Sequence, residues 1–217
     1  MMPVVVGQFP VLAADEVHVW CVDEGVAEQT TVEHRPGWLG QANVSLRRSV
    51  LCQILGGYLG LSPEAVRLVR AAQGKLFLPD HAELQFSLAH SGPFWLVAIT
   101  RGSCIGVDVE RTTPDDLQDV AALHFAETER ARLAGLHGEE YTRAWFALWT
   151  LKEAYAKWLG SGLTETIMQA DILSMLGSQS NLWFENFEPR PGWMAAVVYE
   201  GSPRRMSRFD GSWLNQV

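Results

Sequence analysis

Hydrophobic and polar positions follow two different periods along this chain, which predicts a mixture of strands and helices. Residues 16–22 alternate and are rich in β-branched side chains, as is typical of a strand. Over residues 43–59 the apolar side chains recur at helical spacing, and Ser62 followed by Pro63 marks the start of another short helical segment. Further strands are predicted over residues 84–88, 94–100 and 104–110.

The second half of the chain repeats this order of elements. Residues 115–136 are helical in composition with an interruption near His124, and residues 144–159 form the strongest helical pattern, ended by Gly160. Two closing strands are predicted over residues 182–184 and 193–199.

The repeated order predicts an α+β fold built as a pseudo-dimer of two similar halves. We place the boundary between them near residue 103, which gives halves of residues 1–103 and 104–217. Residues 24–40 are polar, contain Gly and Pro and show no period, so an irregular segment is expected there.

Charge and composition exclude several classes of protein. A net charge of −8 argues against a general nucleic-acid-binding protein, which needs a basic face. No apolar run reaches the roughly 18–20 residues that span a membrane, and the N-terminus lacks the basic start of a signal peptide. The three cysteines form no C-x-x-C pair, so we expect reduced, buried thiols in a cytoplasmic protein.

Acidic side chains on the strand over residues 104–110 are the first candidates for chemistry. Strand alternation points Val107 and Val109 to one face, and Asp108 and Glu110 to the other. Like carboxylates on one face repel each other unless a cation lies between them. The alternative is an exposed edge strand whose charges prevent aggregation.

A second acidic candidate lies on the helix over residues 144–159. Trp149, Glu153 and Lys157 are spaced four residues apart and share one face. By themselves, Glu153 and Lys157 could be an ordinary surface pair, and Lys152 an ordinary solvent-exposed residue. With Asp108, however, Glu153 would complete a set of oxygen ligands suited to Mg²⁺, which favours a phosphate-handling enzyme.

Two predicted turns contain groups suited to an anion, although each of these residues taken alone could equally be a loop residue without a role. His90 and Ser91 lie in a turn between two apolar strands, and Lys75 follows Gly74 in another. Basic residues also recur in small sets that are either solvated faces or anion sites: Arg47 with Arg48, Arg67 with Arg70 and Lys75, and Arg204 with Arg205 and Arg208.

Four motifs together resemble the 4′-phosphopantetheinyl transferases of the longer, surfactin-synthetase-activating type. In chain order, they are GKLFLP over residues 74–79, FSLAHSG over 86–92, GVDVE over 106–110 and WTLKEAYAK over 149–157. The resemblance covers about residues 16–200 and implies a monomeric pseudo-dimer with its active site between the halves. It also implies transfer of the phosphopantetheine arm of coenzyme A to a serine of an acyl or peptidyl carrier protein, which releases 3′,5′-ADP.

The resemblance assigns roles to individual residues. It implies that Asp108, Glu110 and Glu153 bind Mg²⁺ at the pyrophosphate of coenzyme A, and that Glu153 accepts the proton of the carrier serine. It implies that Lys157, supported by Lys152, contacts the phosphate and stabilises the leaving group. Lys75 and His90 match residues that hold the 3′-phosphate of coenzyme A.

The chain departs from the family pattern near the 3′-phosphate. Ser87 and Ala89 stand where the family commonly has Asn and Ser, and Ser91 or a backbone N–H could replace the lost hydroxyl. Val44 stands where an Arg is frequent, and Arg47 or Arg48 could compensate. Two alternatives therefore remain at this point: a protein that binds coenzyme A without transfer, and an interaction domain whose acidic strand is merely solvated.

Overall fold

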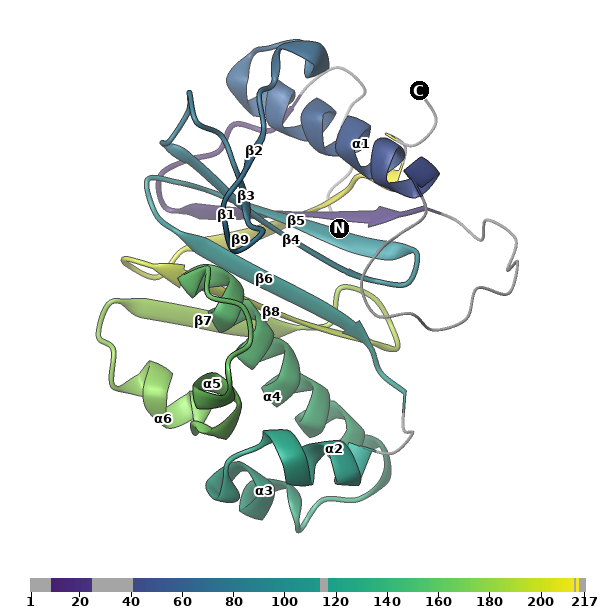
Figure 1. The fold of residues 1–217 in the computed structure, drawn as a ribbon, viewed down its shortest axis with the longest axis vertical. Helices are drawn as coiled ribbons and strands as arrows, with labels where there is room; N and C mark the ends of the chain where they lie inside the picture. The colour runs from purple at the N-terminus through teal and green to yellow at the C-terminus, as the bar shows by residue number, and fades with distance from the viewer. Residues whose placement is uncertain (1–8, 25–40, 114–116, 213, 215–217) are drawn as a thin grey trace.

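The computed structural model describes residues 9–24, 41–113, 117–212 and 214, with side chains from residue 46 onward in the first helix. Its core is layered as helix, sheet, sheet, helix, so the α+β fold class is confirmed (Figure 1). The long helices α1 (Gln41–Leu59) and α4 (Gly138–Leu159) form the outer layers. The predicted irregular segment over residues 24–40 lies almost entirely outside the described residues.

The remaining elements are short helices and strands. The helices are η1 (Pro63–Ala65), α2 (Leu117–His124), α3 (Glu127–Leu133), α5 (Glu165–Gln169) and α6 (Ile172–Gly177). The strands are β1 (Glu16–Asp23), β2 (Val69–Arg70), β3 (Leu76–Phe77), β4 (Leu84–Ser91), β5 (Phe94–Arg101), β6 (Ile105–Arg111), β7 (Leu182–Phe187), β8 (Trp193–Glu200) and β9 (Arg205–Asp210).

The first sheet has the order β4-β5-β1-β9. Strand β9 pairs in parallel with β1, with Val19 opposite Arg208, and a salt bridge joins Arg205 to Glu16. The sequence did not predict β9, because Arg205 and Arg208 were interpreted as part of a solvated basic segment and not of a strand. As a result, a segment near the chain's C-terminal end completes the sheet built mainly by the N-terminal half.

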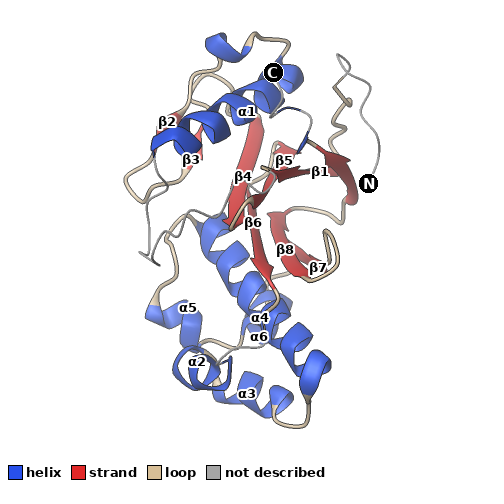
Figure 2. Ribbon diagram, turned by 90° about the vertical axis from the view of Figure 1, so that its right-hand side faces the viewer, coloured by secondary structure: helices blue, strands red, loops and turns tan. Residues whose placement is uncertain are grey.

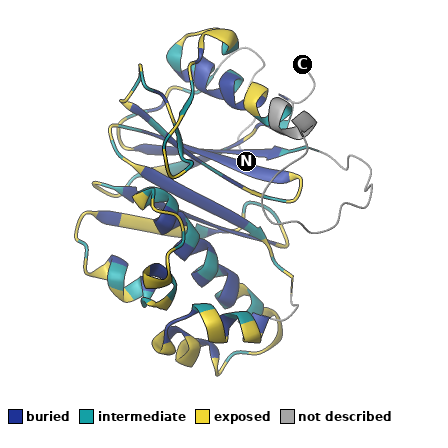
Figure 3. Cartoon of the chain, viewed as in Figure 1, coloured by how far each residue is buried: buried dark blue, intermediate teal, exposed yellow. Residues whose placement is uncertain are grey.

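The second sheet has the order β6-β8-β7 and packs face to face against the first. Val107 and Val109 of β6 are buried between the sheets together with Val17 and Leu96 of the first sheet. As the sequence predicted, Asp108 lies on the opposite face of the strand from these valines, and there it contacts Lys157 of α4. Figure 2 shows α4 lying against β6 and β8, and Figure 3 shows the dark, buried strands between the helical layers.

Strand β4 is one edge of the first sheet and β6 is one edge of the second, and two serines join these edges. Ser87 Oγ accepts a hydrogen bond from the N–H of Val107 (3.1 Å), and Ser91 Oγ accepts one from the N–H of Arg111 (3.3 Å). These bonds give partners to edge amides that no strand ladder pairs. The two sheets thus meet along β4 and β6.

Two predicted helix ends are confirmed in detail. The helix over residues 115–136 is interrupted where expected, since α2 ends at His124 and α3 begins at Glu127. Gly160 ends α4 in the left-handed conformation (φ 76°). No described helix is long and apolar enough to cross a membrane. The expectation of buried thiols holds for Cys21 and Cys52 but is wrong for Cys104, which is exposed.

Candidate active site

The acidic face of β6 is built around Asp108, which is only 3% exposed. Its Oδ1 atom lies 2.6 Å from Nζ of Lys157 on α4, while its Oδ2 atom is buried without a hydrogen-bond partner in the described part of the chain. A buried carboxylate oxygen without a partner is costly unless a cation or donor reaches it. Asp108 therefore has room for one more positively charged partner.

Gly106 determines how closely α4 approaches this strand. A Cβ atom at this position would lie 1.9 Å from the carbonyl oxygen of Ala154 and 2.5 Å from the backbone N of Trp158. Both distances are far inside van der Waals contact, so only glycine allows the two backbones to approach this closely. This close approach brings Glu153 and Lys157 of α4 over the acidic face of β6.

The charges at this junction act strongly on one another. Burial, followed by the negative charge of Asp108, raises the pKa of Glu110 to about 7. The same causes raise the pKa of Glu153 above its usual range. Burial acts to lower the pKa of Lys157, but Asp108 and the two glutamates outweigh it and raise that pKa. The junction is thus a cluster of carboxylates held together by one lysine.

A metal ion fits this cluster on chemical grounds. The described residues contain no group of three or more His, Cys, Asp or Glu side chains already arranged to hold a metal. The Oδ2 atom of Asp108 nevertheless has no hydrogen-bond partner among the described residues, and burial, followed by the charge of Asp108, raises the pKa of Glu110 and Glu153, so a cation at this position would stabilise all three carboxylates. Carboxylate oxygens in this number suit a hard cation such as Mg²⁺.

A pocket of about 640 Å³ lies beside the cluster. It is lined by residues between α1 and β5 and by residues at the end of α4 and just after it. Its basic residues come from α1, from β2 and the turn after it, from β4 and from α4: Arg47, Arg48, Arg70, Lys75, His90 and Lys157. Apolar and small residues complete the lining, among them Leu51, Leu68, Phe86, Ala89, Trp95, Gly160 and Gly162. Because Lys157 belongs to both, the basic pocket opens directly onto the acidic cluster.

Hydrogen bonds fix the basic residues around the pocket. Lys75 Nζ donates to the carbonyl oxygens of Ile105 (3.2 Å) and Lys157 (2.9 Å), which ties the turn after β2 to β6 and α4. Arg47 forms a salt bridge with Glu24 and donates to the carbonyl of Gly92 (3.0 Å). These contacts hold the cations in place without neutralising the whole pocket.

Comparison with known proteins agrees with this geometry. Residues 104–199, which contain β6, α4 and β8, match the sequence model of the 4′-phosphopantetheinyl transferase superfamily. The transferase HetI of Nostoc sp. strain PCC 7120 is 32% identical over 172 residues, covering 71% of this chain and 73% of that protein. The chain belongs to the 4′-phosphopantetheinyl transferase superfamily.

Two Bacillus relatives match over less of their length. The Sfp transferase of Bacillus subtilis strain 168 is 27% identical over 146 residues, which is 63% of this chain and 64% of Sfp. Another 4′-phosphopantetheinyl transferase of Bacillus subtilis is 31% identical over 105 residues, 48% of this chain and 46% of that protein. The chain thus spans less than two thirds of the length of either Bacillus protein.

Most site residues implied by the superfamily resemblance lie together. Asp108, Glu110, Glu153 and Lys157 form the acidic cluster. The residues implied for coenzyme A binding that line the pocket are Lys75, His90, Arg47 and Arg48. Desolvation in the pocket and the charge of Arg47 lower the pKa of His90, which favours the neutral form of its ring. The side chain of Val44 lies outside the described residues.

Two residues do not lie where the superfamily resemblance implied. Ser91 is not among the pocket residues; its hydroxyl contacts Arg111 and lowers the pKa of Glu110, so it belongs to the acidic cluster. Lys152 is 1% exposed, and its amino group is bonded to Glu129 and to three carbonyl oxygens. Such a buried, fully bonded amine has no donor left for a phosphate, which corrects its assignment as a cofactor contact.

Sequence reasoning gave no specific role to Arg70 and did not single out Gln73, which also line the pocket. The only signal was the basic set that Arg70 forms with Arg67 and Lys75. Of these, Arg67 is paired with Asp80 at the surface, so the set divides between the pocket and the solvent. Spacing in the sequence could not show which arginine faces inward, because the residues belong to short irregular elements.

Proposed function

We propose that the chain transfers the phosphopantetheine arm of coenzyme A to a serine of an acyl or peptidyl carrier protein. The serine oxygen attacks the phosphorus that carries pantetheine, the bond to the other phosphate breaks, and 3′,5′-ADP leaves. The observation that carries this proposal is the continuity between the basic pocket and the acidic cluster through Lys157. An anionic ligand with several phosphates can span the two.

Each proposed role follows from the chemistry of the residue. Glu153 is the base for the serine proton, directly or through water, because its raised pKa makes a carboxylate a better proton acceptor. Lys157 neutralises charge on the phosphate and the leaving group. Asp108, Glu110 and Glu153 would hold Mg²⁺, whose contribution when bound is to neutralise the pyrophosphate. Lys75, His90, Arg47 and Arg48 bind the nucleotide end.

The remaining expectations extend this proposal to the whole protein. By its likeness to Sfp and HetI, we assign the chain to the longer, surfactin-synthetase-activating type, built as a pseudo-dimer and active as a monomer. The nucleophile comes from the carrier protein, which explains why the chain needs no catalytic serine or cysteine of its own. The net charge of −8 leaves nucleic acid out as a partner, and we expect a cytoplasmic enzyme.

The direct test is to incubate the protein with coenzyme A, Mg²⁺ and an apo carrier protein. Transfer adds the mass of one phosphopantetheine arm to the carrier and releases 3′,5′-ADP. Stabilisation of the protein by coenzyme A without any change in carrier mass would instead identify a binding protein that has lost transfer. If neither coenzyme A nor Mg²⁺ stabilised the protein and the carrier mass did not change, the result would favour an interaction domain. A panel of fatty-acid, polyketide and peptide carriers then identifies the pathway.

A further inference from the structure

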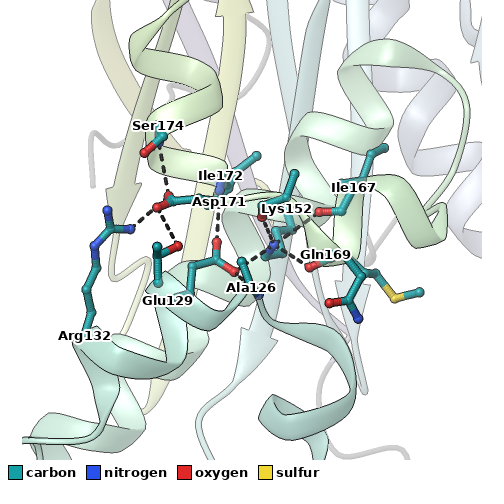
Figure 4. Close-up of polar contacts among 12 residues, drawn as sticks. Ala126, Glu129, Arg132, Lys152, Ile167, Gln169, Asp171, Ile172 and Ser174 are labelled. Atoms are coloured by element: carbon teal, nitrogen blue, oxygen red, sulfur yellow. Dashed lines mark hydrogen bonds and ion pairs between the residues drawn. The ribbon is translucent and has the colours of Figure 1, made fainter.

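The side of α4 that faces away from the acidic cluster is held by a buried ion pair. Nζ of Lys152 lies 2.9 Å from Oε2 of Glu129 on α3, and the two side chains are 1% and 0% exposed. Lys152 also donates to the carbonyl oxygens of Ile167 (3.1 Å), Met168 (2.8 Å) and Ala170 (2.6 Å) at the end of α5. Figure 4 shows these contacts converging on one amino group.

The acidic partner is fixed as completely as the basic one. Glu129 accepts hydrogen bonds from the backbone N–H groups of Ala126 (3.0 Å) and Ile172 (3.0 Å), which lie at the starts of α3 and α6. Among the described residues, the amino group of Lys152 contacts Glu129 and backbone acceptors, and the carboxylate of Glu129 contacts Lys152 and backbone donors, with no other hydrogen-bond partner for either. Swapping the two residues, or moving either side chain, would leave buried hydrogen-bonding groups without partners.

Lys152 immediately precedes Glu153, and this adjacency links the pair to the chemistry. Consecutive helical residues point about 100° apart, so holding the side chain of Lys152 fixes the rotation of α4 about its axis. On another side of α4, Gly106 determines how closely the helix packs against β6. We propose that the buried Lys152–Glu129 pair is a positioning device that sets the rotation of α4, and hence the placement of Glu153 and Lys157.

This inference rests on the proposed function, and its test uses the purified full chain in the carrier transfer assay. The main variant is Glu129→Gln/Lys152→Met, which removes both charges and leaves an amide oxygen for the backbone donors. The matched control is Arg132→Ala, which breaks the neighbouring, partly exposed pair with Asp171 (2.9 Å) but touches no group of α4. Folding of each protein is checked by circular dichroism at the assay temperature.

For the double variant we expect kcat to fall at least about tenfold while the KM for coenzyme A changes less than about threefold, since a small misplacement of reacting groups affects turnover more than ground-state binding. Arg132→Ala should lower the melting temperature and keep the wild-type kcat. A folded double variant with wild-type kcat would overturn the proposal. An equal loss of kcat in Arg132→Ala would also overturn it, because general loosening would then suffice.

If the double variant does not fold, Glu129→Asp alone decides. It keeps both charges of the buried pair but shortens the acidic side chain, so we expect a folded protein with kcat reduced at least about threefold and an unchanged KM for coenzyme A. Wild-type kcat in this variant would overturn the proposal. The proposed function is tested separately, because its failure would show as absence of transfer by the wild-type protein.

Discussion

Nζ of Lys157 lies 2.6 Å from Oδ1 of Asp108, and this contact joins α4 to the acidic face of β6. The carboxylate is nearly buried, with 5% of its side chain exposed, whereas 31% of the lysine side chain remains exposed. The lysine thus supplies the positive charge that the cluster needs while its own side chain still reaches the pocket. Any cation that binds the cluster must share Asp108 with it.

Removal of Lys157 should make the cluster depend more on metal. In Lys157→Ala we expect transfer to fall by about a hundredfold, because a charge-stabilising donor is lost. The increase in melting temperature caused by Mg²⁺ should be larger than in the wild type, since the carboxylates have lost the lysine that neutralises Asp108. Differential scanning fluorimetry with and without Mg²⁺ measures this. The control is Lys157→Arg, which keeps the positive charge. If Mg²⁺ raised the melting temperature equally in wild type, Lys157→Ala and Lys157→Arg, the assignment of Lys157 as the cation of the cluster would be refuted.

Gly106→Ala should separate β6 from α4. The added Cβ would collide with the backbone of Ala154 at 1.9 Å, which cannot move without the helix. We expect a loss of about 1–3 kcal/mol in the free energy of unfolding, together with a large fall in kcat. Chemical denaturation and the transfer assay measure the two effects. The control is Gly135→Ala, where a Cβ meets no atom within 4 Å and stability should change little.

His90→Ala should act on binding of coenzyme A. The ring lines the basic pocket, so we expect the KM for coenzyme A to rise about tenfold with kcat nearly unchanged, as when a charge-assisted hydrogen bond is lost. The comparison substrate is 3′-dephospho-coenzyme A. If His90 contacts the 3′-phosphate, wild type and variant should have the same KM for this substrate. A persisting tenfold difference would place His90 elsewhere on the ligand.

The raised pKa of Glu110, about 7, predicts how stability depends on pH without metal. The folded protein holds this proton up to about pH 7, whereas a carboxyl in the unfolded chain releases it near its ordinary pKa of about 4.5. This contribution to stability is therefore present at pH 4.5 and below and is lost as the pH rises through 7. Melting temperatures measured with a chelator should show this loss, and Glu110→Gln should remove it. A pH dependence identical to wild type would contradict the prediction.

Recurring apolar positions in the longer segments predicted the framework, whereas the short segments were not predicted. The helix over residues 43–59 and the strand over residues 84–88 are confirmed, and apolar side chains of both lie in one core, from Leu46 onward in the helix. The turn predicted around His90 and Ser91 is wrong, because β4 continues to Ser91 and both residues lie on the strand. Helix α4 begins at Gly138, earlier than the predicted residue 144, because its first turns are polar and exposed. Strand β9 was missed because its pairing with β1 depends on residues far apart in the sequence.

The candidate site shows the same division between local and long-range information. Strand alternation placed Asp108 and Glu110 on one face, and helical spacing placed Glu153 with Lys157. The sequence could not show that Lys152, next to Glu153, points into a buried network with Glu129, since that partner lies on another helix. The sequence also could not show that the backbones of β6 and α4 approach closely at Gly106, because this approach depends on how α4 packs.

The most direct test of Mg²⁺-dependent transfer at Asp108 compares wild type with Asp108→Asn in the carrier transfer assay, with Mg²⁺ and with a chelator. We expect wild type to add the phosphopantetheine mass only when Mg²⁺ is present, and Asp108→Asn to add none in either condition while remaining folded. Transfer by Asp108→Asn at the wild-type rate, or transfer by wild type in the presence of the chelator, would contradict this expectation.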